Sequence, residues 1–302
     1  MFWHPRNLYE YARPTLLMWK FTGLPTFKTD PKTNEVIVLQ TSVLCSVAIF
    51  VLTSKFITFT TFYGFENTVE SMMTVNEFVS ICCYNVGFIG TAYLRKRKMA
   101  LLFTKTYLTE VRIRQFCSNK FSYEDISNHL TLVAAIKMIS GLVAAVLDFN
   151  FMIAETKDYA FRYCFYGGFI YYFVSDLTIF FFLTSVEKLY SEFEKKLQQQ
   201  QLVSRSELTE IVEIHTLLRR LAQRMSNEMQ YFLLPKFIND FCLIASDVFY
   251  GATTIIHLSY SLGSTLAITT ALSVWMVIIF HSIVTITYLF DKISEQVGLQ
   301  FC

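Results

Sequence analysis

Six stretches of this sequence are apolar over a length that can cross a lipid bilayer, and this feature restricts the fold more than any other. A membrane-spanning helix needs about 20 mostly apolar residues, because roughly 30 Å of hydrocarbon must be covered at about 1.5 Å per residue. The stretches are residues 36–60, 74–94, 130–154, 163–186, 231–256 and 262–290. They predict an all-α fold, a polytopic transmembrane helical bundle with six membrane helices over residues 36–290.

The composition agrees with a chain embedded in lipid and disfavours several other classes of protein. Hydrophobic residues make up 53% of the 302 residues and aromatic residues 17%, more than a water-exposed surface accommodates. The net charge is only +2, so the basic field that a nucleic-acid partner requires is missing. The seven cysteines include no CxxC pair, and no phosphate-loop, HExxH or GxSxG motif occurs. We expect no enzyme activity, cofactor, metal site or nucleic-acid partner.

Lysine and arginine are concentrated in two of the connections between the predicted membrane helices. Residues 95–120 contain eight of them and residues 188–224 contain seven, whereas residues 63–73 and 257–261 contain none. Positively charged loops stay on the cytoplasmic side of a membrane. The two basic connections are therefore predicted to be cytoplasmic, and the two connections without Lys or Arg are predicted to be outside.

The same alternation places both ends of the chain in the cytoplasm. Residues 1–35 form the predicted cytoplasmic N-terminal segment, with five basic residues and no cleavable signal sequence. Residues 291–302 form the predicted cytoplasmic tail. A G-protein-coupled receptor has an external N-terminus, so the distribution of charge disfavours that class.

Residues 187–229 are too polar to enter a membrane but have a helical pattern. Ser204 and Glu207 have the spacing of a capping box. An apolar stripe at helical spacing follows, formed by Leu208, Ile211, His215, Leu218, Leu221 and Met225. We predict a long cytoplasmic helical extension before the fifth membrane helix. Its stripe packs within the subunit, or several subunits meet there in an intracellular assembly platform.

Two stretches of the sequence are similar to patterns of one receptor family. The first, residues 7–27, has an Arg-Pro pair and then Gly-Leu with a nearby proline and phenylalanine, at Arg13, Pro14, Gly23, Leu24, Pro25 and Phe27. The second, residues 211–250, has a His and a Leu, then an Asn, two leucines and spaced Phe and Tyr, at His215, Leu218, Asn227, Leu233, Leu234, Phe241 and Tyr250. In order and spacing these stretches resemble the insect gustatory receptor family, a branch of the insect chemoreceptors.

The resemblance implies a gustatory (taste) receptor subunit of the plasma membrane, a ligand-gated cation channel that an extracellular small-molecule tastant opens without G proteins. Family members have seven membrane helices, and the seventh lines the pore of a homo- or hetero-tetramer. Here Thr287 and Tyr288 are followed after two residues by Asp291 and Lys292, which breaks the signature of that helix. The seventh helix is therefore expected to be absent, and a truncated receptor or a non-conducting accessory subunit is an alternative.

Ionisable and aromatic residues inside the predicted membrane helices form a candidate ligand site. A charge at mid-membrane costs about 2.5–3.5 kcal/mol on insertion scales, so such side chains should face the bundle or water. The candidates, from mid-membrane toward the outer half, are Asp148, Tyr166, Tyr172, Asp176, Asp247, Tyr250 and Trp275. Aromatic rings with polar edges suit sugars and bitter organic molecules. Two alternatives stay open, namely internal ion pairs for the carboxylates and core or lipid contacts for the rings.

A secondary transporter is the second functional class that intramembrane charges allow, since its substrate site also lies near the midplane. No internal repeat relates the two halves of the sequence, and Gly and Pro interrupt the predicted helices only rarely. Both observations disfavour this class.

Overall fold

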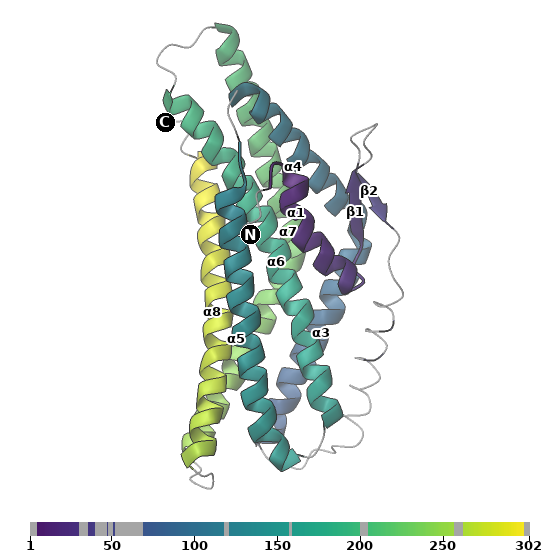
Figure 1. Ribbon diagram of the computed structural model, residues 1–302, viewed down its shortest axis with the longest axis vertical. Coiled ribbons are helices and arrows are strands. Elements are labelled where there is room, and N and C mark those ends of the chain that lie inside the picture. Colours follow the sequence, from purple (N-terminus) through teal and green to yellow (C-terminus); the bar gives the residue numbers. More distant parts are fainter. Residues whose placement is uncertain are drawn as a thin grey trace.

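The computed structural model describes residues 5–29, 36–39, 47, 51, 69–117, 121–156, 159–199, 205–256 and 262–298. These residues form seven helices and one antiparallel pair of strands (Figure 1). The helices are α1 (Leu8–Phe21), α3 (Val69–Leu94), α4 (Lys96–Cys117), α5 (Glu124–Thr156), α6 (Tyr159–Gln199), α7 (Arg205–Ile256) and α8 (Leu262–Gly298). The strands are β1 (Thr26–Thr29) and β2 (Val36–Leu39).

Five of the six predicted membrane stretches lie in helices, which are α3, α5, α6, α7 and α8 in chain order. Among the described residues, three helical segments are long and apolar enough to cross a membrane. They are Glu124–Leu147 of α5, Gly167–Gln199 of α6 and Ile268–Gly298 of α8. The helical class of the fold is therefore confirmed, and the number of six membrane crossings stays a prediction.

The first predicted membrane helix is wrong at its start. Val36–Leu39 form β2, which pairs antiparallel with β1 and places Val38 opposite Phe27. Consecutive β-branched side chains in this run favour a strand over a helix. Phe27 is buried beside Trp19 of α1, with ring centroids 5.5 Å apart, so one face of the hairpin is covered. Nearly all of the remainder of that predicted helix lies outside the described residues.

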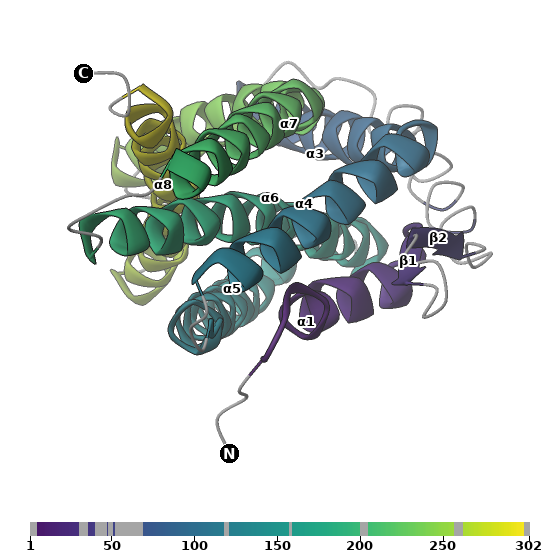
Figure 2. The same ribbon diagram turned by 90° about the horizontal axis from the view of Figure 1, so that it is seen from above.

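Helix α6 is the centre of the bundle. It contacts each of the other six helices in the described part of the chain, and Figure 2 shows it between them when the bundle is viewed along its length. Of its apolar segment 78% is buried, compared with 22% for α5 and 33% for α8. Its run of aromatic residues therefore fills the core of the bundle, whereas α5 and α8 keep broad apolar faces exposed.

The two basic connections lie at the same end of the bundle. In Figure 1, α4 and the adjoining ends of α6 and α7 are at the top, together with α1. The ends of α5 and α6 that adjoin each other, and those of α7 and α8, are at the bottom. The alternation deduced from loop charge thus agrees with the directions of the helices.

Hydrogen bonds at both ends of the amphipathic helix α1 connect it to α4 and α6. Glu110 of α4 accepts a hydrogen bond from the Leu8 N–H at 2.9 Å and one from Arg114 Nε at 2.6 Å. Burial raises the pKa of Glu110, an effect that the charge of Arg114 and the Leu8 N–H oppose. Farther along, Trp19 Nε1 donates to Thr178 Oγ1 of α6 at 2.7 Å.

The Gly-Leu pair that follows α1 has a structural reason. Gly23 has a φ of 75°, a left-handed conformation that glycine adopts without steric cost. The Leu24 N–H donates to the Trp19 carbonyl at 2.8 Å, which is the longer hydrogen bond of a Schellman helix end. Leu24 is buried, so the pair terminates α1 and returns the chain to the core.

The predicted cytoplasmic extension comprises the end of α6 and the first half of α7. Ser204 lies outside the described residues, so the capping box stays a prediction. In the stripe, Leu218, Leu221 and Met225 are buried in the subunit's own core, while Leu208 is exposed. Most of the stripe therefore packs within the subunit.

The arrangement of the helices predicts which parts of the chain an antibody reaches on intact cells. An epitope tag inserted between residues 257 and 261 should be labelled without permeabilisation, because this connection joins the ends of α7 and α8 opposite the basic end. A tag at the N-terminus should be labelled only after permeabilisation. Labelling of the N-terminal tag on intact cells would contradict the orientation deduced from charge.

Candidate functional site

A buried cluster of charged side chains joins four helices at mid-bundle. Asp176 of α6 is its centre, with Oδ2 at 2.8 Å from Lys137 Nζ of α5 and Oδ1 at 2.9 Å from Lys236 Nζ of α7. Ser282 of α8 donates a hydrogen bond to Asp176 Oδ2 at 2.8 Å. Lys236 Nζ also lies 3.1 Å from Oδ2 of Asp240, one turn farther along α7. The cluster connects α5, α6, α7 and α8.

The charges of the cluster balance within it. Two lysines face two aspartates, and each of these four side chains is at most 7% exposed. An unpaired charge removed from water is strongly unfavourable, whereas a hydrogen-bonded pair offsets much of that desolvation. Lys236 and Asp240 share a face of α7 because they are four residues apart. The cluster therefore holds its charges only while its four helices stay together.

Aromatic rings pack against both lysines of the cluster. Lys236 Nζ lies 3.9 Å from the centroid of the Tyr172 ring, and Lys137 Nζ lies 4.7 Å from that of Phe180. The electron-rich ring faces attract both ammonium groups. Tyr84 of α3 packs edge-on against Tyr172 and hydrogen-bonds Ser175 through its hydroxyl. Through Tyr84, helix α3 also contacts the surroundings of the cluster.

A continuous layer of rings extends from the cluster toward α8. Tyr172 packs edge-on against Phe169, with centroids 6.0 Å apart, and Phe169 stacks on Trp275 at 4.2 Å. Phe169 and Asp176 are seven residues apart on α6, and Trp275 and Ser282 are seven residues apart on α8. Seven residues are about two helical turns, so each pair lies on one face of its helix. The aromatic layer and the charged cluster are thus adjacent levels of one core.

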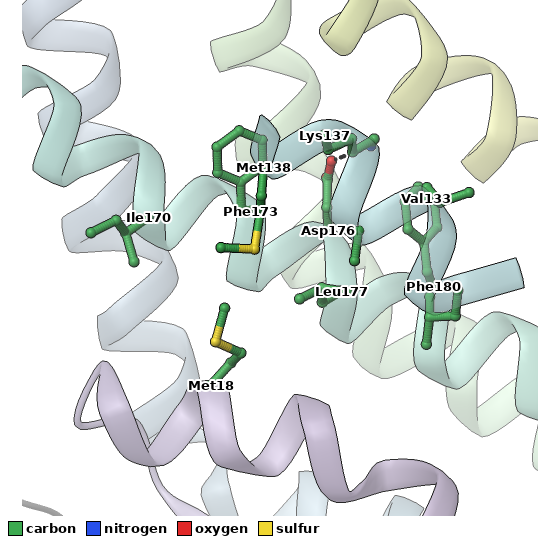
Figure 3. Close-up of a pocket in the computed structure, with 11 residues that line it drawn as sticks. Met18, Val133, Lys137, Met138, Ile170, Phe173, Asp176, Leu177 and Phe180 are labelled. Atoms are coloured by element: carbon green, nitrogen blue, oxygen red, sulfur yellow. Dashed lines mark hydrogen bonds and ion pairs between the residues drawn. The ribbon is translucent and has the colours of Figure 1, made fainter. Parts of the chain in front are cut away.

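A small cavity of about 60 Å³ opens beside the Lys137–Asp176 pair, between α1, α5 and α6. Figure 3 shows the pair facing each other, with Met18 of α1 pointing toward the side chain of Met138 of α5. The other lining side chains are Leu130, Val133, Ala134, Met138, Ile170, Phe173 and Phe180. This space is small beside the 300–1,000 Å³ or so that drug-sized ligands occupy. The cavity suits a small apolar group, because the two charged side chains are already paired with each other.

The structure brings three of the seven sequence-predicted site residues into one core. Tyr172, Asp176 and Trp275 are all buried in the cluster or in the aromatic layer. Asp247 is also buried, two turns beyond Asp240 on α7. The side chains of the other three candidates, Asp148, Tyr166 and Tyr250, lie outside the described part of the structure, so their role stays a prediction. For Asp176, the alternative of internal ion pairing describes what is observed.

Several residues of the cluster were not among the sequence-predicted ligand residues. Lys137, Lys236 and Asp240 stand out as charges within apolar stretches, and the four-residue spacing of the last two indicates an ion pair on one helix. Nothing in the sequence singles out Ser282 among the other small polar residues. Within the described residues no group of three or more His, Cys, Asp or Glu side chains could hold a metal ion. The carboxylates of the cluster face lysines instead.

Comparison with known proteins gives a likeness of fold. No profile of a known protein family matches the sequence, and no curated protein sequence matches it. Among solved structures, that of the insect olfactory receptor OR5 from Machilis hrabei has a TM-score of 0.61, with 12% sequence identity. The match covers 97% of this chain and 81% of the receptor chain. This protein is therefore a helical bundle whose fold is similar to that of this olfactory receptor, and its place among the insect chemoreceptors and in their gustatory branch stays a prediction.

The two aspartates of the cluster should differ in their contribution to stability. Asp176→Asn leaves Lys137 without its carboxylate and should destabilise the protein by about 3–5 kcal/mol, as expected for breaking a buried pair. Asp240→Asn should cost less, because Asp176 still pairs with both lysines. Thermal stability of the protein in detergent, followed by size-exclusion chromatography after heating, measures both.

The exposed Asp291 offers a matched control, since Asp291→Asn removes the same charge outside the cluster. This variant should have the same melting temperature as the wild type. Equal melting of Asp176→Asn and Asp291→Asn would mean that the cluster does not hold the helices together.

Proposed function

We propose that the protein is a chemosensory receptor subunit, a ligand-gated cation channel of the plasma membrane that small-molecule tastants open. The observation that carries the proposal is the likeness of fold to an insect olfactory receptor over 97% of this chain. The sequence patterns around Arg13-Pro14 and His215 support the gustatory branch, because they resemble patterns of that family.

The aromatic layer is the proposed recognition surface. Tyr172, Phe169 and Trp275 combine buried ring faces with a phenol and an indole edge, a combination that suits sugars or bitter organic molecules. Asp148, Tyr166, Asp247 and Tyr250 remain candidates for the outer part of the proposed recognition surface. Binding in this layer needs neither a cofactor nor a G protein.

The charged cluster would couple ligand binding in the aromatic layer to the positions of the other helices. A ligand that shifts the Trp275 ring also shifts α8, and two turns farther along α8 Ser282 is hydrogen-bonded to Asp176. Asp176 in turn holds α5 and α7 through Lys137 and Lys236. Opening would follow if the ligand binds more tightly to the open arrangement of these helices than to the closed one.

The exposed apolar faces support a membrane protein that assembles with other subunits. On α5, Leu132, Ile139 and Leu142 are each more than half exposed, and on α8 the same holds for Val277 and Val284. Such faces contact lipid or a neighbouring subunit. We propose a homo- or hetero-tetramer with other receptor subunits, in which this chain either conducts or acts as an accessory subunit.

A secondary transporter is the second candidate, and the buried charged cluster at mid-bundle is the observation in its favour. Whole-cell recording separates the candidates. Tastant-evoked currents from this chain alone indicate a channel, and currents only with a full-length relative indicate an accessory subunit. Substrate uptake without current would contradict the channel proposal.

Removing one ring of the aromatic layer should weaken the response to ligand. We expect Trp275→Ala to raise the half-maximal tastant concentration by roughly 2- to 10-fold, which corresponds to about 0.5–1.5 kcal/mol for a lost aromatic pair. Tyr288→Phe is the control, because that ring is exposed on the same helix. An unchanged concentration dependence in Trp275→Ala, with normal surface expression, would exclude the aromatic layer as the recognition surface.

A further inference from the structure

Helices α4 and α7 run antiparallel along the basic end of the bundle and are joined by ion pairs at two levels. At one level Arg95 lies 2.6 Å from Glu228, and at the other Arg112 lies 3.5 Å from Glu213. The residue numbers rise from Arg95, directly before α4, to Arg112 of α4 as they fall from Glu228 to Glu213 on α7, which sets the register of the two helices. Opposite charges are thus matched at both levels.

Between these two levels the charges have the same sign. Lys105 lies ten residues after Arg95 and seven before Arg112, and Arg220 lies eight before Glu228 and seven after Glu213, so the two cations come level. Arg224 follows one turn along α7. In the described part of the chain no ion pair includes Lys105, Arg220 or Arg224. Like charges that face each other across two packed helices repel.

A cavity of about 480 Å³ lies between the two helices at this level. The three cations line it together with Gln223 and Asn227, whose amide N–H groups are further hydrogen-bond donors. Glu228 also lines it, but its carboxylate is held by Arg95, whose guanidinium stacks at 3.2 Å on the Tyr231 ring. The cavity therefore has three solvent-exposed positive charges that have no ion-pair partner among the described residues, and a volume suited to a small ligand.

The surrounding sequence favours an anion at this end of the bundle. Helix α4 begins with Lys96, Arg97 and Lys98 and has no acidic residue in its first turn. These charges add to the positive potential near the cavity, whose lining on α4 starts two turns farther along at Lys105. The cavity also lies close to the membrane, since α7 enters its predicted membrane stretch at Tyr231.

We propose that the cavity between α4 and α7 binds a multiply phosphorylated anion. Arginine forks hydrogen-bond two phosphate oxygens at once, and lysine adds a compact positive charge. The chemistry is shared by two sources, the headgroup of a phosphoinositide in the inner leaflet and a soluble inositol phosphate. Bound between the helices, the anion removes the repulsion between Lys105 and Arg220 and ties α4 to α7.

The test measures binding by the purified full-length chain, first of inositol trisphosphate in detergent and then of phosphatidylinositol bisphosphate in nanodiscs of neutral lipid. We expect saturable binding in at least one arm, and the arm that binds more tightly identifies the source. The triple variant Lys105→Gln, Arg220→Gln and Arg224→Gln should bind at least about tenfold more weakly, a loss of about 1.4 kcal/mol, because it removes three cationic hydrogen-bond donors from the cavity.

The matched control is Lys195→Gln, Lys196→Gln and Arg205→Gln, which removes three charges at the same end but outside the cavity. The control should bind like the wild type. Equal weakening of both triple variants, or no binding of either probe by the wild type, would overturn the proposal. If the cavity variant does not elute as a folded protein, Lys105→Gln and Arg220→Gln are measured singly against Arg205→Gln. Neither result depends on whether the chain conducts ions.

Discussion

The carboxylate of Asp176 is the contact on which the rest of the bundle depends. It receives Lys137 from α5, Lys236 from α7 and the Ser282 hydroxyl from α8, and it belongs to the helix that touches all the others. Lipid cannot solvate these groups, so each must find its partner within the protein. The same requirement fixes the rotation of four helices about their axes. This rotation also determines which rings meet in the aromatic layer, two helical turns from the cluster along α6 and α8.

The positions of the five apolar helices could be predicted from the sequence, because length and apolar character determine what a bilayer accepts. Helices α1 and α4 lie in segments for which no helix was predicted. The partners inside the bundle could not be predicted. The spacing of Lys236 and Asp240 along one helix indicates their pairing, but the pairing of Lys137 with Asp176 depends on how two helices face each other. The prediction of a membrane helix from length and apolar character was also wrong at Val36–Leu39. There the apolar run pairs with the strand Thr26–Thr29 and forms a hairpin.

Charges are balanced in the buried cluster at mid-bundle but not in the cavity between α4 and α7. Within the predicted membrane region two lysines are balanced by two aspartates, and the ammonium groups also lie against ring faces. Between α4 and α7, in the part of the chain that the structure describes, three cations form no ion pair with a carboxylate, although ion pairs on either side show that the helices can match charge. Negative charge is therefore in deficit between α4 and α7, whereas positive and negative charges balance in the Asp176 cluster. This difference is the basis for our proposal that the basic end binds an anion from outside the chain.

A double-mutant cycle between Lys137→Met and Asp176→Asn tests the central claim most directly. Unfolding of both single variants and the double variant in detergent gives the coupling free energy of the pair. The account predicts a coupling of about 1–3 kcal/mol, with the double variant more stable than Asp176→Asn alone, because no uncompensated lysine is then left in the core. Additive effects, with the double variant the least stable of the three, would contradict it.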